Sequence, residues 1–319
     1  MGPHVDVSSS WIVVLTWNGR QDTIELLDSL EGAHRAGVQI LVVDNGSSDG
    51  TLAAVQDTYP WARTLQTGEN LGYAGGNNRG IDYAIAQGAE TICVLNNDTI
   101  ATPDFLPPLI ESVVDQEVAV SPDIRYQSDP GTSWFRGARL DRSLGSARHL
   151  VASEQQDGNV PFDTELLSGC CIVASSNTWR QVGGFDEDYF LIFEDSDWSM
   201  RARASGVRLQ VVPMSKIMHK GSRSFRDVAD SLGYYYFVRN GLEFSRRWLG
   251  LSGDLRFIRS LVIRPIAASV RLRAWRRVGH LSVFCVAGVL SFALRRFGRA
   301  GRIVSLSAQV LKSRSSKLE

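Results

Sequence analysis

The sequence of 319 residues has few cysteines, and none of them has the spacing of a metal site or of a disulfide framework. The four are Cys93, Cys170, Cys171 and Cys285, each in an apolar context. Cys170 and Cys171 are adjacent, and disulfide geometry strains a bridge between neighbours. We therefore expect buried thiols in a reducing compartment rather than a disulfide-stabilised secreted scaffold. The sequence also opens without a basic, apolar, cleavable leader, so secretion is not expected.

Other absences exclude whole classes of function. No Gly-Lys-Ser or Gly-Lys-Thr follows the glycine-rich segment 70–78, so a P-loop is excluded. That segment follows a later strand and lacks the glycine spacing of a dinucleotide site, so a dehydrogenase is not expected. The longest nearly uncharged run, Val278 to Leu294, has 17 residues and is shorter than the ~20 of a spanning helix. No reading motif accompanies the basic residues, so we expect no nucleic-acid partner.

The formal net charge of zero hides an uneven distribution. From Ser245 to the end, 16 basic residues stand against two acids, Asp254 and Glu319, which gives +14. The preceding part holds 18 basic and 32 acidic residues, which gives −14. Basic and apolar residues alternate through much of the tail, a pattern typical of an interfacial helix on an anionic membrane surface. A basic helix packed on the domain, or a homodimer contact, is the alternative.

Hydrophobic residues make up 44% and charged residues 21% of the chain, as expected for a globular fold with a sizeable core. Strands and helices alternate in the first hundred residues. Strands are predicted at 11–16, 39–43, around Leu65 and at 91–95, and helices at 22–31, up to Tyr59 and at 79–87. This order predicts an α/β fold with a doubly wound, mostly parallel, Rossmann-like sheet.

The sequence after about residue 120 is less regular. From Ser121 to Phe162 we expect mixed strands and a mobile loop. An apolar stretch from Gly169 to Ala174 precedes a helix through Trp179. Residues 207–212 are predicted as an edge strand that Pro213 stops, with His219 in a polar loop beyond it. We expect a catalytic domain at 1–240 and a basic, amphipathic helical segment at 241–319.

Acidic residues stand where two predicted buried strands end. Asp44 follows one and Asp98 follows the other, and ligands of open α/β sheets bind beyond the carboxyl ends of strands. Asp44 could accept from a ribose hydroxyl or a base N–H, and Asp98 could hold a divalent metal against a phosphate. The alternative for both is a turn residue, since Asp and Asn favour turns.

A second acidic cluster follows the aromatic and aliphatic run 189–193. Capping side chains and acids are both favoured at the start of a helix, which accounts for Ser196 and Asp197. It does not explain Glu194 and Asp195, which could act as general base on a hydroxyl nucleophile. His219 is predicted as a metal ligand or as a loop histidine with its hydrogen bonds satisfied.

Taken in order along the chain, these residues resemble glycosyltransferase family 2, and most closely its bacterial rhamnosyltransferase-like branch. The resemblance covers about Trp11 to Ser224. It rests on Asp44, Asn70-x-Gly72, Asn96-Asn97-Asp98, Gly183-Gly184-Phe185-Asp186, Glu194-Asp195 and His219. It implies a nucleotide-diphospho-sugar transferase fold and an inverting single displacement.

The resemblance also implies a role for each matching residue. Asp98 and His219 would be ligands of Mg²⁺ or Mn²⁺, although the family's D-x-D motif keeps only its last acid here. Asp195 would be the general base, and Lys220 or Arg223 would offset charge on the leaving diphosphate. Substrate-binding roles fall to Thr16, Asn18, Asp44, Asn70, Asn97, Gly169 with Cys170, Glu194 and Arg223.

The expected reaction moves a sugar from a dTDP- or UDP-sugar to a hydroxyl of a glycan or polyprenyl-linked acceptor. Rhamnose is the preferred donor sugar, with galactofuranose or N-acetylglucosamine as alternatives. A noncatalytic nucleotide-sugar or glycan-binding module, or a membrane-interaction protein whose tail is its function, are the competing hypotheses. We expect a cytoplasmic protein, peripheral on the inner face of the plasma membrane.

Overall fold

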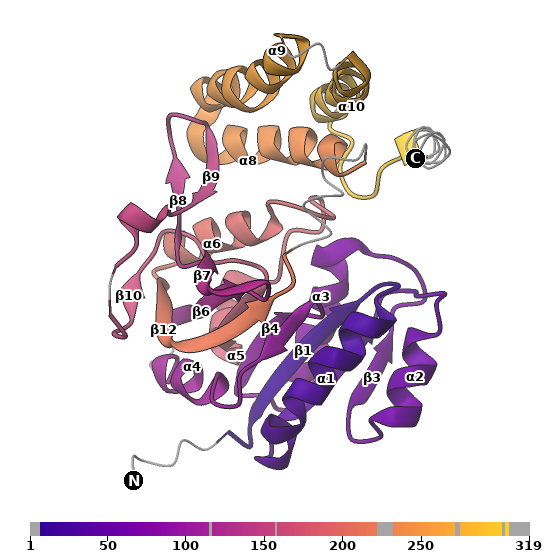
Figure 1. Cartoon of the computed structure of the whole chain (residues 1–319), viewed down its shortest axis with the longest axis vertical. Coiled ribbons are helices and arrows are strands. Elements are labelled where there is room, and N and C mark those ends of the chain that lie inside the picture. Colours follow the sequence, from indigo (N-terminus) through magenta and orange to yellow (C-terminus); the bar gives the residue numbers. More distant parts are fainter. Residues whose placement is uncertain are drawn as a thin grey trace. The chain divides into compact units, whose positions relative to one another are not determined.

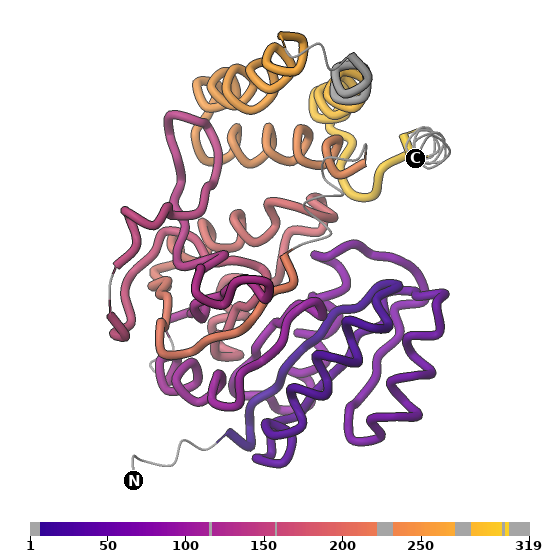
Figure 2. Tube along the Cα trace, viewed as in Figure 1, coloured from indigo at the N-terminus to yellow at the C-terminus, as the bar shows by residue number. Residues whose placement is uncertain are grey.

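The computed structural model describes residues 7–114, 117–156, 158–221, 232–271, 275–301 and 304–305, without the side chains of 275–281. Contacts divide the chain into two compact units (Figure 2). The first unit comprises 1–139, 149–186 and 194–221, and the second comprises 140–148, 187–193 and 222–319. The second unit therefore takes two short segments from the middle of the chain.

A mixed sheet forms the centre of the first unit (Figure 1). Its strands follow the order β10-β12-β6-β11-β4-β1-β2-β3, with β5 paired to β12 and β7 paired to β6. The strands are β1 (Ser10–Thr16), β2 (Gln39–Asp44), β3 (Arg63–Gln66), β4 (Thr91–Asn96), β5 (Thr99–Ala101), β6 (Val118–Tyr126), β7 (Asp129–Phe135), β10 (Phe162–Asp163), β11 (Cys171–Ser175) and β12 (Arg208–His219).

The predicted α/β class with a mostly parallel sheet is confirmed. Strands β3, β2, β1 and β4 are parallel neighbours, as are β6 and β12, whereas β11 runs antiparallel between β4 and β6. The predicted strands at 11–16, 39–43, around Leu65 and at 91–95 are β1 to β4. The mixed strands expected between Ser121 and Phe162 are also present. They include the ribbon of β8 (Ala138–Asp141) and β9 (Ser146–His149).

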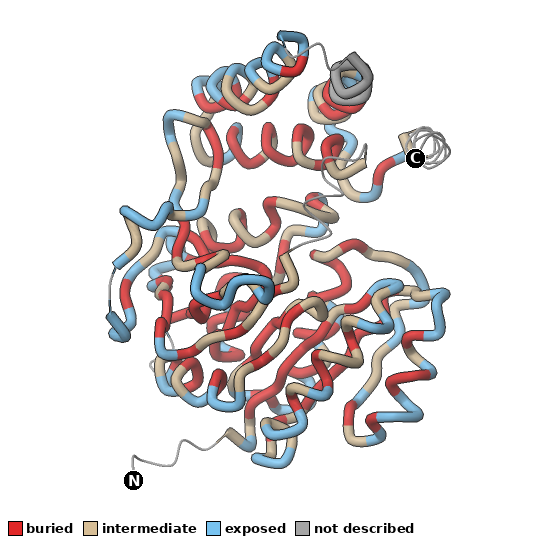
Figure 3. Tube along the Cα trace, viewed as in Figure 1, coloured by how far each residue is buried: buried red, intermediate tan, exposed pale blue. Residues whose placement is uncertain are grey.

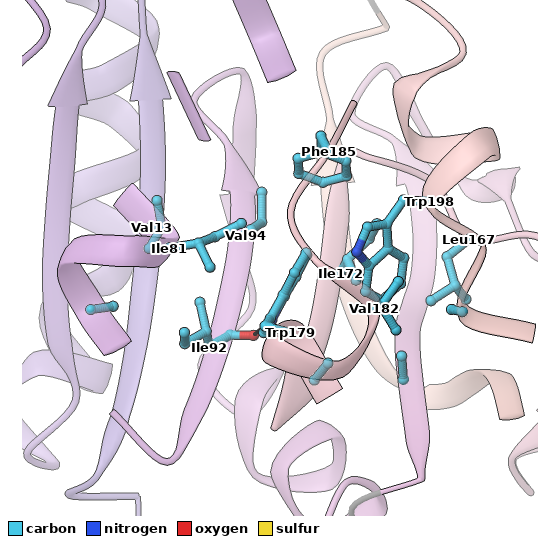
Figure 4. Packing of buried hydrophobic residues seen from close by; sticks show 14 of the residues in the cluster. Val13, Ile81, Ile92, Val94, Leu167, Ile172, Trp179, Val182, Phe185 and Trp198 are labelled. Atoms are coloured by element: carbon cyan, nitrogen blue, oxygen red, sulfur yellow. Dashed lines mark hydrogen bonds between the residues drawn. The ribbon is translucent and has the colours of Figure 1, made fainter. Parts of the chain in front are cut away.

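Helices bury the central strands, which carry almost no exposed residues (Figure 3). Alternate residues of β1 face opposite sides of the sheet. Trp11 and Val13 join a core cluster that includes the tilted rings of Trp179 and Trp198 (Figure 4). The helices of this unit are α1 (Arg20–Arg35), α2 (Thr51–Thr58), α3 (Gly72–Ala86), α4 (Leu106–Ser112), α5 (Ser176–Val182) and α6 (Glu194–Ala204), with a short turn η1 (Ala152–Glu154).

The predicted start of the third helix at residue 79 was wrong, because α3 begins at Gly72 within the glycine-rich segment 70–78. Its glycines serve close packing against the sheet. A Cβ added at Gly76 would lie 2.4 Å from Leu15 Cδ1, and one at Gly80 would lie 2.3 Å from Val13 Cγ1. Propensity favours a loop for such a sequence, but burial of a helix directly on β1 overrides it.

The predicted stop at Pro213 was also wrong. Strand β12 continues from Arg208 to His219 and is internal, between β10 and β6. Its register shifts between Val212 and Lys216, and such a bulge accommodates a proline, which cannot donate a ladder hydrogen bond. His219 therefore ends a strand instead of lying in a loop.

The second unit is mainly helical in its described part. It contains α8 (Leu232–Phe257), which kinks at Gly250, a π-helical stretch η2 (Ile258–Ile263), α9 (Arg264–Arg271) and α10 (Trp275–Ala293). The predicted domain boundary at residue 240 falls within α8. Among the described residues, no helix combines the length and the apolar character needed to cross a bilayer.

Candidate active site

The turns that follow β1 and β2 are joined by side-chain hydrogen bonds. Thr16 and Asp44 are register partners at the ends of these strands. Asn18, with a left-handed φ of 51°, accepts from the Ser48 N–H at 2.8 Å, and its own N–H donates to Ser47 Oγ at 2.9 Å. The Ser47 N–H in turn donates to Asp44 Oδ1 at 3.2 Å. Thr16, Asn18 and Asp44 thus lie together, as a common pocket requires, and their contact with a nucleotide stays a prediction.

Asn70 stabilises the start of α3. Its Oδ1 accepts from the Gly72 N–H at 2.8 Å and from Asn45 Nδ2 at 3.2 Å. Asn45 Oδ1 accepts from the Leu71 N–H at 3.0 Å, which completes a network at this helix end. The Asn70 oxygen is thus satisfied by an Asx turn, since its bond to the Gly72 N–H spans two residues. Its predicted substrate contact stays a prediction.

The side-chain amide of Asn97 forms hydrogen bonds near the start of α1. Its Nδ2 donates to Thr23 Oγ1 at 3.2 Å and to Thr16 Oγ1 at 3.4 Å. A Cβ at Gly19 would lie 2.4 Å from the same Nδ2, so the glycine permits this close approach. Asn97 links the turn after β4 to the turn after β1, and its amide is directed there.

Asp98 and His219 are brought together by strand pairing. Asp98 immediately precedes β5, and His219 is the register partner of Thr99 within β5. His219 Nε2 lies 3.3 Å from Asp98 Oδ2, and His219 is only 2% exposed. Asp98 Oδ1 and His219 Nδ1 are buried without a hydrogen-bond partner in the described part of the chain.

The Asp98–His219 pair has the donor chemistry of a divalent-cation site, since its nearest atoms are a carboxylate oxygen and an imidazole nitrogen. A buried carboxylate oxygen without a partner is unfavourable, and a cation would satisfy it. The described residues contain no cluster of three or more His, Cys, Asp or Glu that could hold a metal. The chain itself would therefore supply two ligands, Asp98 and His219.

Lys220, expected to offset charge on the leaving diphosphate, forms ion pairs with α1, and its contact with a diphosphate stays a prediction. Lys220 Nζ lies 2.6 Å from Asp22 Oδ1 and 2.7 Å from Glu25 Oε2, both on α1. Two carboxylates therefore balance its ammonium group. Arg223, the other residue predicted for this role, lies outside the described residues.

Asp195 has a fixed carboxylate at the start of α6. The Gly169 N–H donates to its Oδ2 at 2.8 Å, and the Ser196 N–H donates to its Oδ1 at 2.6 Å. The Tyr73 hydroxyl donates to the Gly169 carbonyl, which holds the Gly169 segment in turn. A Cβ at Gly169 would lie 3.2 Å from Asp195 Cβ, so glycine permits this approach. Gly169, predicted to bind substrate together with Cys170, thus contacts Asp195, and its substrate contact stays a prediction.

Glu194 differs from its neighbour because it is only 6% exposed. Burial, and then the charge of Asp195, raise the pKa of Glu194 well above its ordinary value of 4.5. Its Oε2 has no hydrogen-bond partner in the described part of the chain. The two adjacent carboxyl groups thus differ in environment, since Asp195 is partly exposed and Glu194 is buried.

Asp98 and Asp195 both affect the pKa of the buried Cys170 thiol. The pKa of the Cys170 thiol is raised well above its ordinary value by burial, then by Asp98, Cys93 and Asp195. Asp98 and Asp195 therefore act on the same buried thiol. The Cys170 carbonyl also accepts from the Asn96 N–H at 2.9 Å, which joins the Gly169 segment to the end of β4.

Sequence reasoning missed two aromatic residues beside His219. The Trp134 ring centroid lies 4.5 Å from that of His219 and 4.9 Å from that of His149. Desolvation lowers the pKa of His149, although the residue as a whole is solvent-accessible, and a hydrogen bond to the Trp134 carbonyl and the charge of Asp195 oppose this. Both residues come from the weakly periodic region between Ser121 and Phe162, where no motif marks them.

Comparison with known proteins identifies the kind of enzyme. The sequence profile described as "Glycosyl transferase family 2" matches residues 11–175. N-acetylglucosaminyl-diphospho-decaprenol L-rhamnosyltransferase of Mycobacterium tuberculosis is 32% identical over 250 residues, which cover 70% of this chain and 80% of the relative. The dTDP-rhamnosyl transferase RfbF of Shigella flexneri is 21% identical, over 75% of this chain and 81% of its own.

Solved structures share the fold. Mannosyltransferase PcManGT from Pyrobaculum calidifontis, in complex with GDP-Man and Mn²⁺, has a TM-score of 0.58 at 16% identity, covering 90% of this chain and 88% of its own. GalNAc-T7 with UDP, GalNAc and Mn²⁺ also has a TM-score of 0.58, at 15% identity, covering 83% of this chain and 58% of its own.

Proposed function

Because the chain belongs to glycosyltransferase family 2 and is a glycosyltransferase, we propose that it transfers rhamnose from a dTDP- or UDP-sugar to a lipid-linked glycan. The observation that supports this most is the pairing of a fixed, accessible carboxylate at Asp195 with the Asp98–His219 pair in one unit. The two rhamnosyltransferase relatives favour rhamnose as the sugar. The decaprenol-diphosphate named for one of them favours a polyprenyl carrier for the acceptor.

The proposed chemistry is a single inverting displacement. Asp195 accepts the proton of the acceptor hydroxyl as that oxygen attacks the anomeric carbon from the face opposite the leaving diphosphate. Hydrogen bonds from the Gly169 and Ser196 N–H groups hold the carboxylate in one orientation, which limits the entropy lost on reaction. The neighbouring Glu194 is buried, and burial raises its pKa well above the ordinary value.

Asp98 and His219 would hold Mg²⁺ or Mn²⁺, with the donor diphosphate and water completing the coordination. The ion, when bound, supplies positive charge to the leaving diphosphate. Thr16, Asn18 and Asp44 would line the nucleotide pocket at the ends of β1 and β2, and Gly169 with Cys170 would form part of the acceptor wall.

The helices of the second unit favour association with an anionic membrane on the cytoplasmic side, at the inner face of the plasma membrane. Large apolar side chains are exposed there beside exposed arginines, as on interfacial helices. The exposed apolar residues are Leu251, Leu255, Ile263, Val270, Val283, Val286, Leu290 and Leu294. The exposed arginines include Arg256, Arg259, Arg264 and Arg271. This surface would bring the enzyme to a polyprenyl-linked acceptor.

A donor screen tests the proposed function. Thermal shifts are measured with dTDP-rhamnose, UDP-galactofuranose and UDP-N-acetylglucosamine, each with and without Mn²⁺ or Mg²⁺. We expect the largest metal-dependent stabilisation with dTDP-rhamnose, and transfer to a polyprenyl-diphospho-N-acetylglucosamine acceptor. Absence of metal-dependent stabilisation by every donor would contradict the proposal. Sedimentation with anionic vesicles at low salt tests the membrane surface, which is refuted if the full-length protein stays in the supernatant.

A further inference from the structure

Trp134 occupies an irregular position in β7. Phe135 pairs with Ile124 of β6, and Ser133 pairs with the next residue of β6, so Trp134 is an extra residue between them. An extra residue of this kind forms a β-bulge, which changes the direction of a side chain relative to the regular alternation of the strand. The direction of the Trp134 side chain is therefore set by the bulge.

The residues next to Trp134 hold the bulge in place. Ser133 Oγ donates to Asp123 Oδ1 at 2.6 Å, and Arg136 Nη1 donates to Asp123 Oδ2 at 3.0 Å. Asp123 lies on β6 and has 0% exposure, so this shared acceptor is shielded from water. Phe135 is buried as well. The backbone at Trp134 therefore has little freedom to move.

The indole ring of Trp134 contacts the imidazole of His219. Their ring centroids are 4.5 Å apart and their planes are inclined by 43°, a distance typical of interacting aromatic rings. His149 lies edge-on to the same indole at 4.9 Å, and its Nδ1 donates to the Trp134 carbonyl at 3.1 Å. All three residues belong to the first unit. The half-buried indole is thus held beside His219 by its own strand and by His149.

The orientation of the His219 imidazole has few polar restraints. The His219 backbone is fixed, because β12 pairs with both β5 and β6 at this residue. Nε2 lies 3.3 Å from Asp98 Oδ2, whereas Nδ1 has no hydrogen-bond partner in the described part of the chain. A histidine that binds a metal is usually oriented by a hydrogen bond at its other ring nitrogen. Packing against Trp134 is the contact that can replace this hydrogen bond.

We propose that Trp134 is a positioning residue for His219, whose imidazole it holds in the orientation that metal binding requires. The inference rests on the proposed function, in which Asp98 and His219 hold Mg²⁺ or Mn²⁺. The simpler alternative is that Trp134 only covers apolar surface of the sheet. The two differ in whether loss of the indole weakens metal binding or only lowers the stability of the first unit.

The test measures Mn²⁺ affinity of the full-length protein from the electron paramagnetic resonance signal of the free ion, so it needs neither donor nor turnover. Trp134→Leu removes the ring but keeps an apolar side chain, and Trp134→Phe keeps an aromatic ring. We expect Trp134→Leu to weaken Mn²⁺ binding at least about tenfold, because loss of a group that orients a metal ligand has an effect of this size. Trp134→Phe should stay within about threefold of the wild type.

Trp61 provides a matched control in the same unit. It is half-buried and stacks on His34 with ring centroids 4.6 Å apart, so it repeats the contact of an indole with an imidazole at another place. Trp61→Leu should leave Mn²⁺ affinity within about twofold of the wild type, even if it lowers Tm as much as Trp134→Leu does.

Wild-type Mn²⁺ affinity in Trp134→Leu would overturn the inference and leave the proposed function intact. An equal loss of affinity in Trp61→Leu would also overturn it, because the effect would then follow from stability alone. If the wild type binds no Mn²⁺, the metal assignment of the proposed function fails and the inference fails with it. Trp134→Met, which also lacks a ring, replaces Trp134→Leu if that variant does not fold.

Discussion

Replacing Glu194 by glutamine should make the stability of the first unit less dependent on pH. Burial raises the pKa of Glu194 in the folded chain, so the folded state holds the proton at pH values where the unfolded state has lost it. The stabilising contribution is complete below the ordinary value of 4.5 and is lost as the pH rises through the folded pKa. Glutamine is neutral at every pH, so the variant does not lose this stability as the pH rises.

The size of the effect follows from linkage. Each tenfold difference in proton affinity between the folded and unfolded chains corresponds to about 1.4 kcal/mol of unfolding free energy. For a unit of this size, 1 kcal/mol of unfolding free energy shifts Tm by about 2–4 °C, so each tenfold difference in proton affinity shifts Tm by about 3–6 °C. Thermal melts of wild type and Glu194→Gln between pH 4.5 and 9 should therefore diverge, the variant gaining on the wild type as the pH rises.

The slope of this difference is the test, because glutamine can change the stability by a constant amount through the unpartnered atom at this position. Parallel melting curves over the whole range would refute a raised pKa for Glu194 in the folded chain. If the Tm of Glu194→Gln fell further below that of the wild type as the pH rises, the contradiction would be stronger.

Three further changes test the site and the packing that carries it. Gly169→Ala places a methyl group 3.1 Å from the Tyr73 hydroxyl and 3.2 Å from Asp195 Cβ, so kcat should fall about threefold to tenfold with donor affinity unchanged, as measured by initial rates and calorimetry. Asp98→Asn should abolish the Mn²⁺-dependent part of the donor-induced thermal shift but keep the metal-independent part; a full metal-dependent shift would contradict the metal assignment. Gly80→Ala should destabilise the first unit by about 1–3 kcal/mol in urea unfolding, because the new Cβ would lie 2.3 Å from Val13 Cγ1; an unchanged midpoint would contradict the packing account.

The parallel half of the sheet could be predicted because each strand is a short, continuous apolar run ended by polar residues. The runs at β2 and β4 are buried on both faces, which makes composition alone informative. Asp44 and Asp98 were found in the same way, as acids at strand ends. The sequence could not show that Asp98 lies beside His219, because that contact depends on the pairing of β5 with β12 across more than a hundred residues.

Elements set by tertiary packing could not be predicted. The first turns of α3 contain glycines that favour a loop, and only their close approach to Leu15 and Val13 explains a helix there. Pro213 usually ends a strand, but a bulge lets β12 continue past it. Trp134 lies beside His219, and His149 lies beside Trp134, in a region without a motif. The hydrogen bond from Gly169 to Asp195 likewise joins residues whose separation in sequence gives no signal.

The most direct test of the account compares Asp195→Asn with Glu194→Gln, the same chemical change at adjacent positions. Both variants are assayed for donor binding by thermal shift and for sugar transfer under the same conditions. We expect both to bind the donor like the wild type, while transfer falls about 10²–10⁴-fold in Asp195→Asn and stays within about threefold of wild type in Glu194→Gln. Transfer by Asp195→Asn at the rate of Glu194→Gln would contradict the assignment of Asp195 as the general base.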